Sequence, residues 1–223
     1  MEPSPSPATD LFRRHVAYDL LRIQAVSLAP ENPFTWASGL RSPIYCDNRL
    51  TMAYPGIRKK LTEGFVALLR QHTLEPAVIV GTATAGIPHA AWLAHRLGLP
   101  MAYVRSTPKG HGHGNQIEGR LEPGQRVVVV EDLVSTGMSS MRVVEVIREQ
   151  AQADVAALLA IFTYGLAGVD ARFAAAAVPF YALTDFDALL TVASEQAHLT
   201  DENLQSLKAW QRDPQGWSEA HRG

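Results

Sequence analysis

Two adjacent acidic residues, Glu131 and Asp132, directly follow an apolar run of four valines at 127–130. A short run of this kind is typical of a strand in a parallel sheet that is buried on both faces. In open sheets of parallel strands, ligands bind outside the carboxyl ends of the strands. The run therefore predicts a strand that delivers two carboxylates to a ligand-binding edge.

The residues after this acid pair are rich in hydroxyl groups and glycine, and a helix is expected to follow them. Backbone N–H groups at such a turn and at the start of a helix suit a phosphate. A ribose 5-phosphate would match both parts, with vicinal hydroxyls for the acids and a phosphate for the turn. In the alternative interpretation, Ser135 caps the helix and the acids are a solvated strand end. The segment has neither a Walker loop nor a dinucleotide-binding glycine pattern.

A second chemical signal is the stretch 105–119, which combines Arg105, Lys109 and His111 with four glycines. Cations of this kind suit an anionic group, and a long glycine-rich loop is typical of a lid that closes over a site. The alternative is a solvent loop with incidental charge. His111 and His113 are a weak signal for a metal, because no cluster of cysteines or carboxylates accompanies them. No metal ligand is assigned to the protein.

Apolar runs and helical periods alternate along the rest of the chain. Strands are expected at 77–80, 101–104, 127–130, 155–162 and 178–183, although Ala and Leu leave a helix possible at 155–162. Helices are expected at 10–28, after Pro55, and at 87–97, 140–150, 185–193 and 201–210. A hairpin with a long loop is expected to join 34–36 to 44–46. This order predicts right-handed strand–helix–strand units and a parallel sheet.

Composition narrows the class of protein. The 223 residues suit one domain, and with 47% hydrophobic residues they can bury a core. The formal net charge of −2 argues against a chain that coats nucleic acid or an anionic membrane. The single Cys46 excludes a disulfide framework and is compatible with a reducing cytoplasm. No apolar stretch approaches 18 residues, and residues 1–9 lack the features of a signal peptide, so a disordered tail is expected there.

The valine strand, the acid pair and the Ser-Thr-Gly-x-Ser turn together resemble the phosphoribosyl pyrophosphate (PRPP) signature of type I phosphoribosyltransferases. Three further segments resemble orotate phosphoribosyltransferases: 103–112 their mobile catalytic loop, 34–45 their substrate hairpin and 82–88 their pyrophosphate loop. These similarities span roughly residues 33–140. The resemblance implies an α/β fold in one domain (10–223), a mostly parallel sheet flanked by helices. Its expected parts are a hairpin hood at about 10–50, a core at about 54–184 and closing helices at about 185–212.

The resemblance also implies an activity: transfer of the phosphoribosyl group of PRPP to orotate, which gives orotidine 5′-phosphate and pyrophosphate in pyrimidine nucleotide biosynthesis. It implies an oxocarbenium-like transition state, Mg²⁺ held mainly by PRPP, and a cytoplasmic homodimer whose mobile loop is shared between subunits. The implied catalytic residues are Lys109, Arg105, His111 and Asp132. The implied PRPP-binding residues are Arg105, Lys109, His111, Glu131, Asp132, Leu133, Val134, Ser135, Thr136, Gly137, Met138 and Ser139. Ser135 and Tyr45 are the implied orotate contacts, and the implied pyrophosphate loop is Thr82, Ala83, Thr84, Ala85 and Gly86.

The chain departs from the family pattern at several cations. Ala37, Ala85 and Ser106 stand where many members carry Lys, and no Arg lies at 162–165 to hold orotate. Glu131 replaces the commoner first Asp and still supplies a carboxylate. The residue that holds the orotate carboxylate stays open, with Arg41 as one candidate. Two alternatives stay open as well: a phosphoribosyltransferase for another base, or a non-catalytic PRPP-sensing regulator, for which no nucleic-acid surface is evident.

Overall fold

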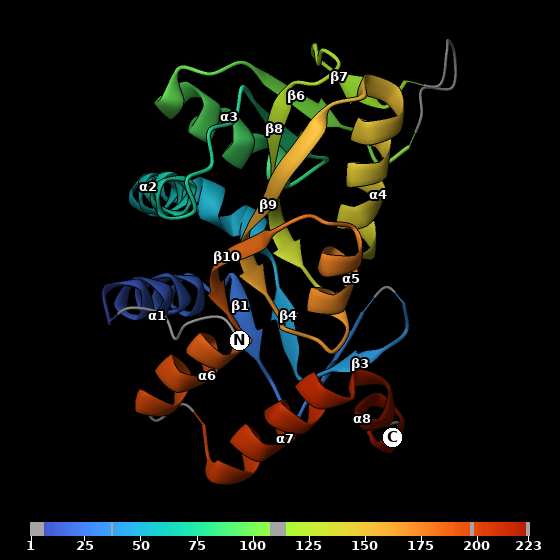
Figure 1. Cartoon of the computed structure of the whole chain (residues 1–223). Helices are drawn as coiled ribbons and strands as arrows, with labels where there is room; N and C mark the ends of the chain where they lie inside the picture. The colour runs from blue at the N-terminus through green and yellow to red at the C-terminus, as the bar shows by residue number, and fades with distance from the viewer. Residues whose placement is uncertain (1–6, 37, 108–114, 197–198, 222–223) are drawn as a thin grey trace.

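A computed structural model describes residues 7–36, 38–107, 115–196 and 199–221 (Figure 1). At its centre is a six-stranded sheet in the order β10-β9-β8-β5-β6-β7. Neighbouring strands are parallel, except that β7 is antiparallel to β6. The strands are β5 (Val78–Thr82), β6 (Met101–Val104), β7 (Ile117–Glu118), β8 (Arg126–Val134), β9 (Asp154–Thr163) and β10 (Phe180–Asp185).

The sheet is buried because helices cover both of its faces. Figure 1 shows α1, α2 and α3 on one side and α4 and α5 on the other. Every residue of β5 is buried, and the four valines of β8 are fully inaccessible to solvent, as a strand that is covered on both faces requires. The helices are α1 (Pro7–Arg22), α2 (Pro55–Gln71), α3 (Gly86–Leu97), α4 (Met138–Val146), α5 (Val169–Ala175), α6 (Phe186–Glu195), α7 (Asp201–Arg212) and α8 (Pro214–Ala220).

Two small antiparallel ribbons form the hood at the carboxyl end of the sheet. In one, β1 (Val26–Leu28) pairs with β4 (Ile44–Cys46), and in the other, β2 (Phe34–Thr35) pairs with β3 (Arg41–Ser42). A 3₁₀ helix, η1 (Asn48–Ala53), leads from β4 into α2. The predicted single hairpin is therefore wrong in its pairing, because 44–46 pairs with β1 and not with 34–36. Pro43 lies between β3 and β4, where the chain passes from one ribbon to the other.

The predicted sheet is confirmed, and the details differ at several places. The first helix begins at Pro7, inside the tail expected at 1–9, and ends at Arg22, so 26–28 is a strand and not helix. The segment 155–162 is strand β9 and not helix. The helix after the acid pair ends in a π-helical turn, η2 (Ile147–Ala151). The two-residue β7 and the short α5 and α8 were not predicted, because segments of this length carry too little periodicity.

The closing helices pack on the hood and on the first helix. Trp210 of α7 is fully buried against Trp36 and Tyr164, with ring centroids 5.8 and 5.3 Å away. The backbone N–H of Arg41 donates to the buried Ser218 hydroxyl of α8 over 2.9 Å. These contacts fix the hood against the core of the sheet. Within the described part of the chain, no helix combines the length and the apolarity that crossing a bilayer requires.

Candidate active site

The acid pair lies on a part of β8 that extends beyond its neighbour β5. β8 pairs with β5 only as far as Val130, whereas its pairing with β9 continues to Val134. The strand predicted at 127–130 is four residues longer at its carboxyl end, because β9 continues beside it as far as Val134. Glu131 and Asp132 are therefore held in extended backbone at the open edge that the end of β5 leaves.

Glu131 is nearly buried, with 8% of its surface exposed. Its Oε1 accepts a hydrogen bond from the Thr82 hydroxyl at 2.6 Å and another from the Asp132 backbone N–H at 3.1 Å. Burial first, and then the negative charge of Asp132, raise the pKa of Glu131 to about 8. Burial also raises the pKa of Asp132 above its ordinary value. In the free protein the pair therefore resists carrying two negative charges, which a ligand with hydroxyl donors or a cation would relieve.

The turn after β8 leads directly into α4. Gly137 adopts a left-handed conformation (φ 76°), and a Cβ there would lie 3.1 Å from the Phe173 ring. The Arg172 side chain of α5 donates to the Thr136 carbonyl and ties the turn to that helix. Ser135 is half-buried, while Thr136, Met138 and Ser139 are exposed. The N–H groups at the start of α4 thus face an open turn, as an anion site requires.

The predicted pyrophosphate loop connects β5 to α3. It comprises Thr82, Ala83, Thr84, Ala85 and Gly86, and the Ala83–Thr84 peptide bond is cis. The Ala83 N–H donates to the Val104 carbonyl at the end of β6 over 2.9 Å. A Cβ on Gly86 would lie 2.4 Å from both the Thr82 hydroxyl and the Val130 carbonyl. Gly86 therefore allows α3 to begin in direct contact with β8, which brings this loop beside the acid pair.

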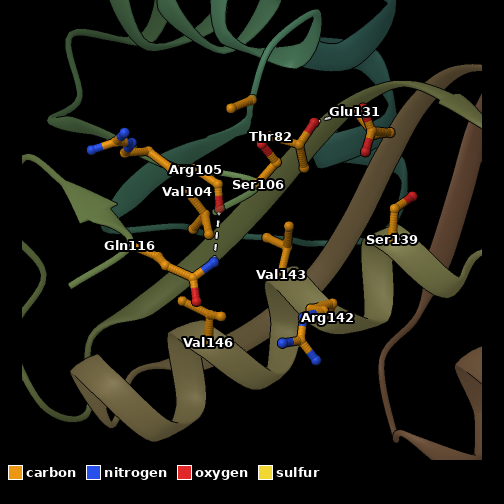
Figure 2. Close-up of a pocket in the computed structure, with 11 residues that line it drawn as sticks. Thr82, Val104, Arg105, Ser106, Gln116, Glu131, Ser139, Arg142, Val143 and Val146 are labelled. Atoms are coloured by element: carbon orange, nitrogen blue, oxygen red, sulfur yellow. Dashed lines mark hydrogen bonds between the residues drawn. The ribbon is translucent and has the colours of Figure 1, made fainter. Parts of the chain in front are cut away.

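A cavity of about 120 Å³ lies between β5, β8 and α4 (Figure 2). Its lining residues come from the ends of β5 and β6, the residues that follow them, Gln116, β8 and one face of α4. They are Thr82, Ala83, Val104, Arg105, Ser106, Gln116, Glu131, Ser139, Arg142, Val143 and Val146. Figure 2 shows the Glu131 carboxyl turned toward Thr82 at one end of this group and Gln116 at the other. The structure thus gathers Glu131, Arg105 and the first two residues of the predicted pyrophosphate loop around one cavity, which Asp132 does not line.

The base of the cationic loop is fixed on both sides. The Arg105 N–H donates to the Gln116 carbonyl at 2.8 Å, and the Gln116 side chain donates to the Arg105 carbonyl at 3.0 Å. Gln150 accepts from the Gln116 N–H at 3.0 Å, and the Arg105 guanidinium lies 3.6 Å from Glu118. Lys109 and His111 lie outside the described residues. Gln116 was not predicted as a site residue, because its sequence shows only a polar residue before a short strand.

The hood supplies aromatic side chains near the acid pair. Tyr45 is 43% exposed, and its ring centroid lies 5.6 Å from that of Phe34. Next to it, the Cys46 thiol has a pKa well above its ordinary value, because it is desolvated and close to Asp132. Tyr164, at the end of β9, likewise has a raised pKa through burial. The exposure of Tyr45 leaves its ring able to stack on a planar ligand, and its role as an orotate contact stays a prediction.

Arg41 is half-buried on β3. Its Nη1 lies 3.5 Å from the Thr35 hydroxyl, and its buried Nε has no hydrogen-bond partner among residues 7–36, 38–107, 115–196 and 199–221. Ala37, one of the departures from the family pattern, lies outside the described residues. The structure does not bring Arg41 into the cavity that contains Glu131 and Arg105.

The architecture and the site together define a class of protein. A six-stranded, mostly parallel sheet flanked by helices, with an acid pair on its central strand and a hood over its carboxyl end, is the type I phosphoribosyltransferase fold. In agreement, a family described as "Phosphoribosyl transferase domain" matches residues 55–165.

Comparison of whole chains narrows the class to one family. Orotate phosphoribosyltransferase of Halalkalibacterium halodurans is 53% identical over 208 residues, which are 92% of this chain and 99% of that one. The crystal structure of orotate phosphoribosyltransferase from Aeropyrum pernix is 30% identical with a TM-score of 0.71 over 83% of this chain and 99% of that one. Leishmania donovani UMP synthase is 26% identical with a TM-score of 0.75, over 88% of this chain and 41% of that one. The chain belongs to the orotate phosphoribosyltransferase family.

Proposed function

We propose that this protein transfers the 5-phosphoribosyl group of PRPP to orotate and releases pyrophosphate and orotidine 5′-phosphate. The observation that carries the proposal is the acid pair on the extension of β8, placed between the turn that begins α4 and the loop that begins α3. Membership of the orotate phosphoribosyltransferase family and 53% identity to a member support the choice of orotate.

In this proposal each part of PRPP has its own protein partner. Glu131 and Asp132 accept hydrogen bonds from the ribose hydroxyls, and their charge stabilises the positive charge that develops on the ribose in an oxocarbenium-like transition state. The backbone N–H groups of residues 135–139 bind the 5-phosphate. The loop 82–86, together with Arg105, Lys109 and His111, binds the pyrophosphate as it leaves.

Orotate would lie between the phosphate turn and the hood. We assign Ser135 and the exposed Tyr45 as its contacts, the first by hydrogen bonding and the second by stacking. The orotate carboxylate needs a cation, and Arg41 with its unpaired Nε is the candidate that the hood offers. This last assignment requires Arg41 to turn toward the site when the base binds.

A magnesium ion fits this site when PRPP supplies most of its ligands. Mg²⁺ prefers oxygen ligands such as carboxylates, and the Glu131 carboxyl group lies in contact with both the Asp132 side chain and the Thr82 hydroxyl. Within the described part of the chain, no three His, Cys, Asp or Glu side chains form a metal cluster. Mg²⁺ would neutralise charge on the pyrophosphate, while Asp132 and Glu131 orient the ribose.

We also propose a homodimer in the cytoplasm. Leu50, Met52 and Tyr54 of the η1 segment expose 41%, 36% and 41% of their surfaces. The Arg58 guanidinium lies 4.9 Å from the Trp92 ring nearby, between α2 and α3. An apolar patch bordered by aromatic and Arg side chains is the composition found at the centres of protein interfaces.

The assay that tests the proposed function follows orotate absorbance with PRPP and Mg²⁺, with adenine, hypoxanthine, xanthine and uracil in parallel. We expect turnover of orotate only, abolished by a chelator. Turnover of another base in place of orotate would refute the assignment of the substrate, and PRPP binding without any turnover would refute the assignment as an enzyme.

A further inference from the structure

Asn48 is the first residue of η1. Its side-chain amide reaches β8, the strand that carries the acid pair. Asn48 is 1% exposed, and its Nδ2 donates to the Asp132 backbone carbonyl over 2.7 Å. Its signal in the sequence is only a polar residue in a loop, so sequence analysis did not select it. The bond joins segments that are 84 residues apart in the chain.

The place of this bond follows from the sheet. The Val130 carbonyl faces β5, because its oxygen lies 3.3 Å from the hydroxyl oxygen of Thr82, whose hydrogen goes to Glu131. Carbonyls two residues apart in a strand point to the same side, so the Asp132 carbonyl points to the same edge, past the last residue of β8 that pairs with β5. The Asn48 amide therefore takes the place that a residue of β5 would have taken if that strand were longer.

A second set of contacts holds the backbone of Asn48. Its backbone carbonyl accepts from the Thr51 hydroxyl at 2.6 Å, and the Thr51 oxygen lies 3.4 Å from His89 Nε2. Because the Thr51 hydrogen goes to Asn48, this network assigns the other hydrogen to His89 Nε2. Burial lowers the pKa of His89 to about 4, so the ring is neutral at neutral pH. His89 lies in α3, the helix that begins at the pyrophosphate loop.

Stability alone is a poor explanation for an asparagine here. The Asn48 Oδ1 is buried and has no hydrogen-bond partner among the described residues, which is an unfavourable state for a polar atom. The Asn48 amide therefore makes one bond through its donor, to the Asp132 backbone, and none through its acceptor within the described residues.

We propose that Asn48, supported by Thr51 and His89, is a positioning residue that fixes Asp132 for the transfer reaction. The inference rests on the proposed function, because Asp132 is the acid assigned to the ribose. Asn48 acts through the Asp132 backbone and through no contact with substrate. Its loss leaves the carboxylate present but free to turn away from the position it needs in the transition state.

The direct test replaces Asn48 with Asp, which keeps the shape and exchanges the N–H donor for a carboxyl group, and with Ala, which removes the donor without adding a charge. We expect kcat to fall about 10- to 100-fold while KM for orotate changes less than about threefold, because the interaction is needed mainly in the transition state. Assays run well below each variant's Tm separate this effect from lost folding.

A matched pair of variants keeps the proposal testable if the Asn48 variants fold poorly. Thr51→Val and Thr62→Val each remove a buried hydroxyl bonded to a backbone carbonyl, of Asn48 and of Arg58 respectively. We expect Thr51→Val to lower kcat severalfold, Thr51→Ser to restore it, and Thr62→Val to change Tm alone. Equal kcat in the wild type, Asn48→Asp and Thr51→Val would overturn the proposal.

Failure of the proposal is distinguishable from failure of the proposed function. A wild-type protein that does not turn over orotate contradicts the function itself, whereas an active wild type with unaffected variants contradicts only the role of Asn48. PRPP binding measured by calorimetry provides a readout besides turnover. We expect Asn48→Asp to weaken it by a smaller factor than it lowers kcat, and an equal loss of both would indicate a merely structural role.

Discussion

Glu131 is a carboxyl group that the fold places out of water and next to a second carboxyl. Its partner Thr82 donates one hydrogen bond, and no cation among the described residues forms an ion pair with it that would offset the burial. The pKa of about 8 is the result. Such a group costs stability in the free protein above its unfolded pKa, since the fold must either keep the carboxyl protonated or bury its charge.

The stability of the free protein should therefore fall as pH rises. The Glu131 pKa is about 8 in the folded protein and near its ordinary 4.5 when unfolded, so between these values the folded state binds more protons. Stability from this group is complete below about pH 4.5 and is lost as pH approaches 8. Glu131→Gln should flatten the fall and raise Tm at pH 8.5 by several degrees or more, since a shift of this size costs on the order of several kcal/mol and each kcal/mol shifts Tm by roughly 2–4 °C. Thermal melts from pH 5 to 8.5 check this, and parallel curves for both proteins would contradict it.

Lys109 is the cation that the family resemblance assigns to the leaving pyrophosphate. Lys109→Ala should lower kcat by about 100-fold or more, as expected for loss of a group that stabilises developing charge. Its Tm should stay within about 1 °C of the wild type, since a glycine-rich loop of the kind that the sequence predicts carries little packing energy. His113→Ala, in the same segment, is the control and should be nearly as active as the wild type. An equal loss of activity in both variants would argue against a specific role for Lys109.

At the scale of elements, the site depends on how closely α3 approaches β8. Gly86→Ala would place a methyl group 2.4 Å from the Thr82 hydroxyl and the Val130 carbonyl. The backbone must then move, at a cost of about 1–3 kcal/mol, and with it the loop and the acid pair. Activity should fall more steeply than stability. Gly56→Ala in the first turn of α2, where a Cβ meets nothing within 4 Å, should leave both intact. Tm and kcat/KM measured on both variants test this, and a fully active Gly86→Ala would refute the close approach.

The same elements show what sequence could and could not predict. The valines at 127–130 and the Ser-Thr-Gly turn predict a strand that carries two acids and a turn that leads into a helix, because burial on both faces and turn chemistry leave local patterns. The pairing of 44–46 with β1 and the extension of β8 depend on neighbours distant in the chain, so no local pattern contains them. Asn48 and Gln116 were missed for the same reason, since their partners Asp132 and Arg105 are brought to them only by the tertiary fold.

At the scale of the whole molecule, the proposed dimer with a shared loop predicts complementation between subunits. Lys109→Ala and Asp132→Asn proteins should each be nearly inactive alone. If Lys109 acts on the partner subunit's site, mixed dimers regain one complete site. Random exchange should then restore about a quarter of wild-type activity, since half of the dimers are mixed. Mixing followed by assay tests this, with mixed dimers verified by mass spectrometry. Verified mixed dimers without activity would show that each loop serves its own subunit.

The most direct test of the account identifies the products formed from PRPP and orotate by the wild type and by Asp132→Asn. We predict that the wild type forms orotidine 5′-phosphate and pyrophosphate in equal amounts. We expect a loss of about 100-fold or more in the variant, which stays folded because only the charge of a partly exposed side chain changes. A folded wild-type protein that binds PRPP and forms no orotidine 5′-phosphate, or an Asp132→Asn variant with full activity, would contradict it.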